Sequence, residues 1–575
     1  MADSQSQGQH RLSKSVFPII ERRFFPECPW HRFYPPDVPR ALEFPPMRAE
    51  QLLLSACDAF PDRVALRYFK ANWPYHELRQ RVKLVASNLY RYGIRPGDRV
   101  MLALPNCPEF VLLWFALHWI GAEIVPANPL YSTDELLHLA EQCEVRAVAG
   151  LDLKLAPIAR LTRRYSLPLL IVCSLSAHLP RWLRYGYRLK LWLTRWGEIN
   201  RRTKVIKFKK LYRPEVYPIA EPLLDDPQRP AVLQPTGGTT GVPKLAVLSH
   251  ANLQANVAQL HAWCGLEPGE ESVLCVLPFF HIFGCTVSML SPLAGGATLL
   301  LLPRFDIRRV WSVCRKWRPS VAPMVPFMFA ALLDEMERRR QPLEGLKLCF
   351  SGAAPLDAAV HHRFEQLTGA TIFEGYGLSE ASPVTHSNPP GKAARPGTIG
   401  VPLPGTLAKL VDRETGCREV GPGEVGELCI RGPQVMQGYL NRPDETAEVI
   451  RDGWLHTGDM ARQDADGFFR IVDRKKDMII SGGLNVYPTE VEAVLMQHPD
   501  IAECAIFGRP HRLFGEQVAA AIVPKPGRPI SEASVRAFCE EHLARYKVPR
   551  TIEIHQRLPK NFLGKVRRAA LRRAG

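Results

Sequence analysis

The sequence predicts a mixed α/β fold with a β-rich subdomain, divided into a large amino-terminal domain and a small, mobile α+β carboxy-terminal domain. Three features carry this prediction. Short apolar runs that follow turn residues alternate with longer helical stretches from Ala49 onward. Glycine and proline become dense between Ala394 and Ile430, which is typical of short strands joined by turns. A charged turn, Asp473–Asp477, then precedes a final stretch with an alternation of its own.

The individual elements follow from these runs. Turn residues at 61–64 and 96–100 lead into apolar runs, so we expect strands at Ala65–Tyr68 and Met101–Leu104. The same reasoning predicts strands at Val273–Leu277, Ala297–Leu302, Lys347–Phe350, Ala408–Val411, Gly426–Ile430, Phe468–Val472, Ala502–Phe507 and Val518–Ile522. We expect helices at Pro488–Met496 and after Ser531, a candidate N-cap, where Val535, Phe538 and Leu543 share one face.

The length of the chain predicts several domains. At roughly 100–200 residues per domain, 575 residues correspond to three to five domains or subdomains rather than one large core. We expect an amino-terminal extension at 1–48, a large domain at 49–472, a hinge at 473–478 and a small domain at 479–575.

The composition excludes several classes of protein. An apolar fraction of 46% is too high for a mainly disordered chain. The best apolar run, Phe110–Ala122, is shorter than the ~20 residues that a membrane-spanning helix needs. The first ten residues are polar and lack the apolar region of a secretory signal. Fourteen cysteines without a C-x-x-C pair indicate reduced thiols in a cytoplasmic enzyme rather than disulfides or a zinc site.

Much of the net charge of +17 lies in one basic, amphipathic segment at 160–213. Its part from Arg181 to Arg213 holds twelve basic residues and one acidic residue, so it contributes +11. On a helical wheel, one face carries Trp182, Tyr185, Leu189, Trp192, Leu193 and Trp196, and another carries Arg181, Arg184, Arg188 and Arg195. This pattern predicts peripheral contact with an anionic membrane. An ordinary surface helix packed on the core is the alternative, and no nucleic acid is expected because no nucleic-acid-binding motif accompanies the charge.

A glycine- and threonine-rich loop is the strongest chemical signal. Residues Leu233–Lys244 read LQPTGGTTGVPK, with three glycines, three threonines and a lysine. Glycines let backbone N–H groups turn toward an anion, while the hydroxyls add donors and the lysine adds a charge. Such a loop suits a triphosphate. It is not a Walker A loop, because no G-K-[ST] follows the first glycines.

This loop resembles the phosphate-binding loop of the adenylate-forming superfamily, which includes acyl-CoA synthetases, aryl-CoA ligases, peptide-synthetase adenylation domains and firefly luciferase. Five further motifs occur in the family's order, so the resemblance extends over about residues 50 to 575. They are Ser351–Pro355, Gly375–Glu380 with Ser379 in place of threonine, Trp454–Asp459, the hinge Asp473–Asp477 with Ser481–Gly483, and Pro559–Lys565.

The resemblance implies a role for each motif. The ATP-binding residues would be Thr236, Gly237, Gly238, Thr239, Thr240, Gly241, Lys244, Gly352, Ala353, Ala354, Gly375, Tyr376, Gly377, Ser379, Asp459 and Arg474. Glu380 would bind Mg²⁺, and Thr236, Glu380, His281 and Lys565 would be the catalytic residues. His281 would lie at the acyl pocket. Lys476 would be the pivot of the hinge, and Gly482 and Gly483 would lie near the CoA tunnel. Three departures from the family pattern are Pro235, Leu245 and Leu484.

The resemblance implies a long-chain fatty-acid–CoA ligase that uses ATP, Mg²⁺ and CoA. We expect a cytoplasmic protein that contacts the inner face of the membrane peripherally and forms a homodimer. An aryl- or medium-chain-CoA ligase of the same superfamily is the first alternative. A catalytically silent protein that binds a membrane surface or nucleic acid is the alternative from another class.

Overall fold

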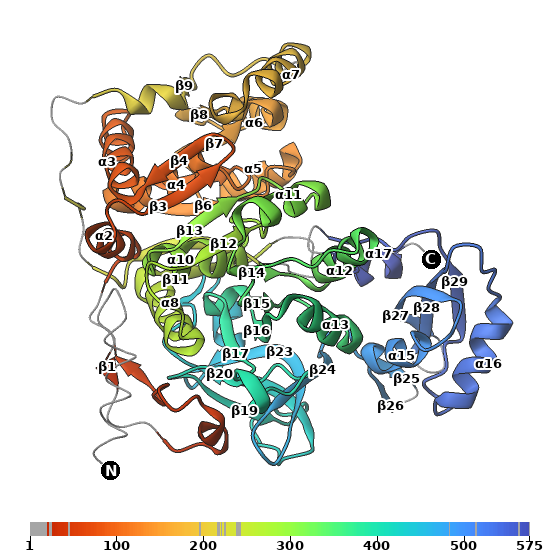
Figure 1. The fold of residues 1–575 in the computed structure, drawn as a ribbon. Helices are drawn as coiled ribbons and strands as arrows, with labels where there is room; N and C mark the ends of the chain where they lie inside the picture. Colours follow the sequence, from red (N-terminus) through yellow and green to blue (C-terminus); the bar gives the residue numbers. More distant parts are fainter. Residues whose placement is uncertain are drawn as a thin grey trace. The chain divides into compact units, whose positions relative to one another are not determined.

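The protein, described by a computed structural model, forms two compact units of mixed α/β structure, as the sequence predicts (Figure 1). The described residues are 20–21, 26–43, 47–194, 197–214, 219, 221–223, 226–236, 243–481, 484–511, 515–561 and 564–573. The first unit comprises residues 1–397, 401–407 and 431–450, and the second comprises 398–400, 408–430 and 451–575. The β-rich stretch is thus grouped mainly with the carboxy-terminal residues. The boundary at 473–478 stays a prediction.

Two large, mainly parallel sheets form the first unit. One has the order β21-β11-β10-β6-β5-β7-β8-β9, and the other has the order β18-β17-β16-β15-β14-β12-β13-β3-β4. The strands of the first sheet are β5 (Arg99–Ala103), β6 (Glu123–Pro126), β7 (Ala147–Leu151), β8 (Leu169–Cys173), β9 (Lys204–Lys207), β10 (Pro230–Pro235), β11 (Leu245–Ser249) and β21 (Gly438–Tyr439). Those of the second are β3 (Val64–Tyr68), β4 (Ala71–Pro74), β12 (Ser272–Cys275), β13 (Thr298–Leu301), β14 (Val321–Met324), β15 (Leu348–Ser351), β16 (Thr371–Gly377), β17 (Val384–Ser387) and β18 (Val401–Pro402). The five strands predicted in this unit are confirmed to within two residues.

A helix that is apolar on every side lies in the core of the first unit. All residues of α4 (Pro108–Ile120) are buried, as expected for a helix without a polar face. The run Phe110–Ala122 is therefore a core helix, and none of the helices in the described residues is long and apolar enough to cross a membrane. The other long helices are α2 (Ala49–Ala59), α3 (Tyr75–Arg91), α5 (Thr133–Gln142), α6 (Ala156–Arg164), α7 (Arg181–Leu193), α8 (His250–Cys264), α11 (Ile307–Trp317), α12 (Pro326–Arg339) and α13 (Ala358–Thr368).

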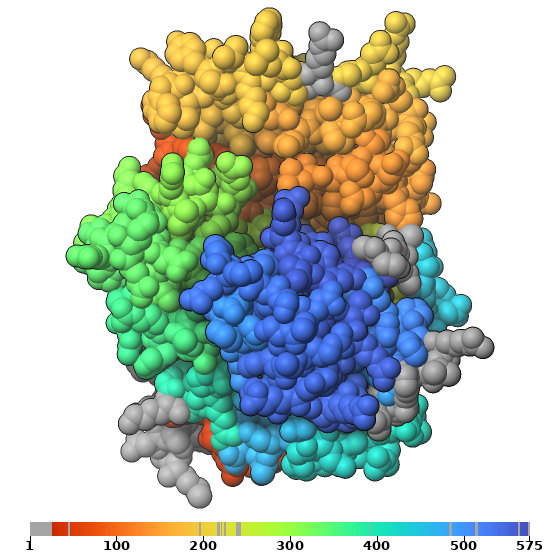
Figure 2. All heavy atoms as spheres, turned by 90° about the vertical axis from the view of Figure 1, so that its right-hand side faces the viewer, coloured from red at the N-terminus to blue at the C-terminus, as the bar shows by residue number. Residues whose placement is uncertain are grey.

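The basic segment 160–213 lies on one edge of the first unit. It contains the end of α6, the whole of α7 and the edge strand β9, and it occupies the gold and yellow surface at the top of Figure 2. The predicted amphipathic helix forms as α7, although Gly186 lies within it. Arg195 and Trp196, which the wheel also assigned to this helix, lie outside the described residues.

The second unit holds two five-stranded sheets. One contains β19 (Leu407–Val411), β20 (Val425–Arg431), β22 (Ile450–Arg451), β23 (Trp454–Gln463) and β24 (Phe469–Arg474). The other contains β25 (Ile479–Ser481), β26 (Leu484–Val486), β27 (Ile501–His511), β28 (Gly515–Pro524) and β29 (Thr551–Ile554). Its helices are α15 (Pro488–Leu495), α16 (Glu532–His542) and α17 (Arg568–Arg573).

The predicted elements of the second unit are found, with one correction. Ser531 caps α16 through its side-chain oxygen, which accepts the Ser534 N–H. Leu543 is not part of the helical face, because α16 ends at His542 and Leu543 is extended (φ −126°, ψ 149°). Leu543 still packs against the same hydrophobic cluster as Val535, so the sequence pattern found the right core but extended the helix by one residue.

Candidate active site

The predicted phosphate loop lies between two paired strands. Thr236, directly after β10, donates its N–H to the Lys244 carbonyl at 2.8 Å, next to the start of β11. This bond continues the antiparallel register in which Pro235 faces Leu245. Residues Gly237, Gly238, Thr239, Thr240 and Gly241 lie outside the described residues. Leu245 is buried in a hydrophobic cluster with Leu233, so packing accommodates this departure from the family pattern.

A chain of polar contacts joins Lys244 to Glu380. The Lys244 ammonium forms an ion pair of 2.6 Å with Glu445 and lies 4.8 Å from the centre of the Tyr439 ring. The Tyr439 hydroxyl donates to Glu380 Oε1 at 2.9 Å. The Met436 N–H donates to the Glu380 backbone carbonyl at 2.7 Å. Residues 431–450, which belong to the first unit, therefore contact Glu380 through both Met436 and Tyr439. These contacts bring two of the predicted site residues, Lys244 and Glu380, into one neighbourhood.

Burial and neighbouring charges set the protonation states of Tyr439 and Glu445 in this series of contacts. Burial, together with the neighbouring Glu380 carboxylate, raises the pKa of Tyr439 far above its usual range, so its hydroxyl stays a donor. The hydrogen bonds from Lys244 and Arg442 lower the pKa of Glu445, so it stays charged. Lys244 therefore faces a permanent anion.

The predicted adenine-side residues lie at the carboxyl ends of two parallel strands. β15 and β16 pair with Ser351 opposite Glu374, so the residues that follow them share one edge of the sheet. They are Gly352, Ala353 and Ala354 after β15, and Gly375, Tyr376, Gly377 and Ser379 at and after the end of β16. Ala353 and Ala354 are exposed, and Ala353 adopts a left-handed φ of 71°. A side chain at position 377 would meet the Pro383 carbonyl oxygen at 2.3 Å, so this position requires glycine.

His281 begins the short helix α9 (Ile282–Cys285), where its Nδ1 accepts the Phe283 N–H at 3.3 Å. Burial lowers the pKa of His281 to about 4, so the ring is neutral at physiological pH. The preceding Phe280 carbonyl accepts a 3.3 Å hydrogen bond from Gln234, on β10. The aromatic segment 278–281 is thus tied to the strand that leads into the phosphate loop.

In the second unit, Asp459 and Arg474 face each other across neighbouring strands. They are register partners on β23 and β24, and their side chains form an ion pair of 2.9 Å. Asp459 is buried, whereas Arg474 is half-buried. The Gly458 N–H, just before Asp459, donates to Glu427 Oε1 at 3.1 Å, and Lys475 pairs with Glu427 Oε2 at 2.7 Å. Glu427 therefore binds the backbone N–H just before Asp459 and the side chain just after Arg474.

Lys565 lies near that pair, within the same unit. Its backbone N–H donates to Asn561 Oδ1 at 2.9 Å, and Asn561 donates back to the Lys565 carbonyl at 2.8 Å, which forms a tight turn. Desolvation lowers the pKa of the Lys565 ammonium below its usual range, and the Arg474 charge adds to this effect while the Asp459 carboxylate opposes it. Part of the Lys565 residue still reaches solvent.

The predicted hinge is a turn between β24 and β25. Lys476 is exposed in this turn, and neighbouring Asp473 accepts the Thr489 N–H at 2.8 Å. Gly482 and Gly483, and the side chain of Leu484, lie outside the described residues. The predictions for these three positions therefore stay open.

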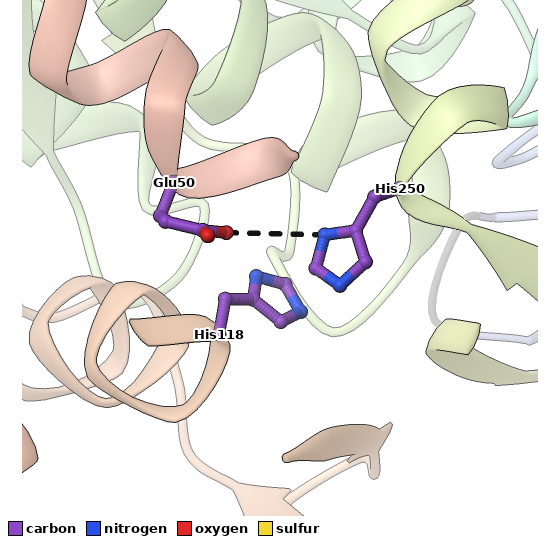
Figure 3. Close-up of side chains that lie close together, drawn as sticks. All are labelled: Glu50, His118 and His250. Carbon is purple, nitrogen blue, oxygen red and sulfur yellow. Dashed lines mark ion pairs between the residues drawn. The ribbon is translucent and has the colours of Figure 1, made fainter. Parts of the chain in front are cut away.

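Three potential metal ligands meet away from these residues: Glu50, His118 and His250 (Figure 3). The contacts around them disfavour a metal ion. Nδ1 of His250, the atom that faces Glu50 at 3.9 Å, accepts the Ala49 N–H, and Glu50 forms an ion pair of 3.1 Å with Arg48. Burial lowers the pKa of His118 to about 3 and that of His250 well below its usual range. We interpret the cluster as a buried network of two neutral histidines and one ion pair that joins α2, α4 and α8.

Sequence reasoning missed four residues that contact the candidate site. They are Gln234, Glu427, Tyr439 and Glu445. Gln234 lies inside the phosphate-loop motif, so its position was a usable signal. The other three lie outside every motif that the sequence analysis singled out, and only the folded chain brings them to the site.

The chain is similar to known proteins over most of its length. Residues 53–440 match the model of the AMP-binding enzyme family, and residues 490–565 match that of the AMP-binding enzyme C-terminal domain. The long-chain-fatty-acid–CoA ligase of Bacillus subtilis (strain 168) is 37% identical over 545 residues, which cover 94% of this chain and 97% of that protein. The ATP-bound structure of MatB from Rhodopseudomonas palustris is 28% identical with a TM-score of 0.75, covering 92% of this chain and 99% of that one. The anthranilate CoA ligase AuaEII in complex with anthranoyl-AMP is 27% identical with a TM-score of 0.78, covering 92% and 98%.

The fold and the matched models define an adenylate-forming enzyme. The chain belongs to the AMP-binding enzyme family, and within that family it is an acyl-CoA ligase.

Proposed function

We propose that this protein is a long-chain fatty-acid–CoA ligase that uses ATP. The fatty-acid carboxylate attacks the α-phosphate of ATP, which gives acyl-AMP and releases pyrophosphate. The CoA thiolate then attacks the acyl carbonyl, and AMP leaves. The observation that carries the long-chain substrate is the similarity, over almost the full length of both chains, to a long-chain-fatty-acid–CoA ligase.

The first unit would bind the phosphates. We propose that Thr236, Lys244 and the loop between them hold the β- and γ-phosphates, and that Gly352–Ala354 and Gly375–Ser379 hold the adenine. Glu380 fits a Mg²⁺ ligand, because the Tyr439 hydroxyl fixes the orientation of its carboxylate and one carboxylate plus phosphates is a usual Mg²⁺ site. When bound, Mg²⁺ would neutralise phosphate charge. His281, neutral and partly exposed, would contact the acyl group.

The second unit would act on the ribose and on the developing charge. The buried Asp459 carboxylate, held by Arg474, suits two ribose hydroxyls as donors. Lys565 would stabilise the charge that develops as the carboxylate attacks the α-phosphate, an effect realised in the transition state. Its neighbours Asp459 and Arg474 are the proposed ribose and phosphate ligands, which supports this role.

The CoA step would follow a rotation of the small domain about Lys476, with Gly482 and Gly483 near the thiol. A cytoplasmic location and a homodimer also remain proposals. We propose the same peripheral contact with an anionic membrane that the sequence predicts.

A panel of acids tests this function. We expect palmitate to drive pyrophosphate release and acyl-CoA formation faster than acetate or cinnamate. Cinnamate or a medium-chain acid as the best substrate would instead favour the first alternative, which the likeness to an anthranilate CoA ligase supports. A protein that exchanges pyrophosphate into ATP with none of these acids would favour the catalytically silent alternative, against which the intact Glu380, Asp459 and Lys565 argue.

A further inference from the structure

Helix α7 is held to the first unit by only one of its faces. Leu183, Tyr187 and Leu191 are half-buried on this face. The Arg184 guanidinium donates to the carbonyl oxygens of Ser176 (3.1 Å), Ala177 (3.3 Å) and Leu179 (3.4 Å). The Tyr187 hydroxyl donates to Asp152. Arg184 therefore anchors the helix and does not belong to its solvent-facing cations, which corrects the sequence-based grouping.

The opposite face of α7 presents large apolar side chains to solvent. Trp182, Tyr185, Leu189, Trp192 and Leu193 are each 60–80% exposed. These five account for a third of the fifteen large apolar side chains found exposed in the described residues, although α7 has only 13 residues. Because the polar contacts of Arg184 and Tyr187 set the rotation of the helix, this apolar face is fixed outward rather than hidden against the core.

Positive charge surrounds the apolar face. Arg181, Arg188 and Lys190 are exposed on α7, which contains no acidic residue. The edge strand β9 adds exposed Lys204 and Lys207, with the partly exposed Val205 between them. Both elements lie along the same edge of the first unit in Figure 1 and Figure 2.

We propose that this surface, α7 with β9, docks on an anionic lipid bilayer. Tryptophan, tyrosine and leucine on one face, with arginine and lysine beside them, are the residues of a helix that lies in the headgroup region with its apolar face buried. Burial of the apolar side chains of α7 in the bilayer and attraction of the nearby cations to anionic headgroups would both favour binding. The advantage of docking, access to a long-chain acid dissolved in the bilayer, rests on the proposed function, but the docking itself does not.

Two other partners fit this surface less well: a second copy of the chain and a nucleic acid. A second copy seated on the same face would bring cationic α7 helices together without an acidic residue on either, which is unfavourable. For a nucleic acid, the aromatic residues would need to lie among the cations as stacking platforms. Leu189 and Leu193, which lie on the same line of the helix as Trp182, offer no such platform, whereas a bilayer takes leucine and tryptophan alike.

Vesicle binding tests the proposal without any substrate. The full chain is sedimented with vesicles of phosphatidylcholine alone or mixed with phosphatidylserine, at low and at physiological salt. We expect binding to the mixed vesicles that weakens but persists as salt rises, because salt screens the charges and not the apolar contact. Arg181→Glu/Arg188→Glu/Lys190→Glu should weaken low-salt binding at least about 10²-fold, since each cation near an anionic surface strengthens binding about fivefold and each new carboxylate is repelled by it. Trp182→Ser/Leu189→Ser/Trp192→Ser should remove the binding that survives salt.

Matched controls change exposed residues elsewhere on the first unit. Arg304→Glu/Arg308→Glu/Arg340→Glu and Leu130→Ser should bind as the wild type does. All variants should keep the wild-type melting temperature and activity on a short, water-soluble acid, because α7 lies outside the candidate site. A wild-type protein that ignores mixed vesicles at low salt overturns the proposal. Vesicle binding by the α7 variants that equals wild-type binding also overturns it. The same holds if the wild type does not bind vesicles but forms a dimer that the apolar variant abolishes. A preference for a short acid would instead overturn the proposed substrate and leave the docking intact.

Discussion

Tyr439 donates its hydroxyl to the Glu380 carboxylate at 2.9 Å, although the two residues are 59 positions apart in the chain. The same tyrosine ring lies 4.8 Å from the Lys244 ammonium. One side chain thus contacts both the proposed Mg²⁺ ligand and the lysine of the phosphate loop. This relationship leads to the first prediction.

Tyr439→Phe should weaken the use of Mg²⁺ without unfolding the protein. The variant keeps the ring but removes the hydroxyl that orients Glu380. A hydrogen bond to a charged group contributes about 1.5–3 kcal/mol, so adenylation at limiting Mg²⁺ should slow roughly 10- to 10²-fold. ATP–pyrophosphate exchange against Mg²⁺ concentration measures this. Tyr131→Phe, which removes a hydroxyl elsewhere in the unit, should have no such effect. An unchanged Mg²⁺ dependence would show that Tyr439 does not position Glu380.

Glu445→Gln should lower the KM for ATP. The Lys244–Glu445 pair is only partly buried, and such pairs contribute up to about 1 kcal/mol, a factor of about five. If Lys244 must leave Glu445 to reach a phosphate, removing the anion should strengthen ATP binding by about two- to fivefold. Asp444→Asn, a charge change at the neighbouring exposed residue, is the control. A higher KM would mean that Glu445 holds Lys244 in its working position.

Lys565→Ala should slow acyl-AMP formation by roughly 10²–10³, as loss of one preorganised donor does. CoA attack on supplied acyl-AMP should be much less affected. The pKa of Lys565 is lowered, so the ammonium loses its proton at a lower pH than an ordinary lysine, whose pKa is about 10.4. The wild-type adenylation rate should therefore begin to fall, as the pH rises, before the pH reaches that value. Lys565→Arg, if active, should lack this fall. Lys560→Ala in the same turn is the control, and equal losses in both half-reactions would contradict the domain-rotation account.

Lys476→Pro should separate the two half-reactions in the opposite way. Proline fixes φ near −65°, so a residue that must change its dihedral angle during rotation would be trapped. We expect adenylation to persist while acyl-CoA formation falls sharply. Stopped-flow measurement of each step checks this. Wild-type turnover by the variant would place the pivot elsewhere.

Glu427→Gln should destabilise the second unit and reduce its sensitivity to acid. Burial acts to raise the pKa of Glu427, but the hydrogen bond and charge of Lys475, with His456, outweigh it and leave the pKa below its usual range. Stability from this group is therefore present above the unfolded pKa of about 4.3 and is lost as the pH falls through the lower folded value. Removing it should cost about 2 kcal/mol at pH 7 and less in acid. Urea unfolding across this range measures the difference, and a loss independent of pH would contradict this assignment.

Local patterns in the sequence were sufficient for much of the fold. The strand at Ala65–Tyr68, the helix at Pro488–Met496 and the Ser531 cap depend on neighbours within a few positions, and the structure confirms them to within a residue. Ordered motifs such as Leu233–Lys244 and Pro559–Lys565 identified the family for the same reason, because each motif is contiguous.

The sequence by itself therefore determined the class of protein, the positions of ten of its strands and the amphipathic character of residues 181–193. Only the tertiary structure decided which face of α7 packs, because Arg184 and Tyr187 find their partners on other elements. Only the tertiary structure placed Tyr439 beside Glu380, and Glu427 beside Lys475 across 48 positions. The physical reason is that a pattern in the sequence reports periodicity and local capping, whereas a hydrogen bond between distant residues depends on how the sheets align in space.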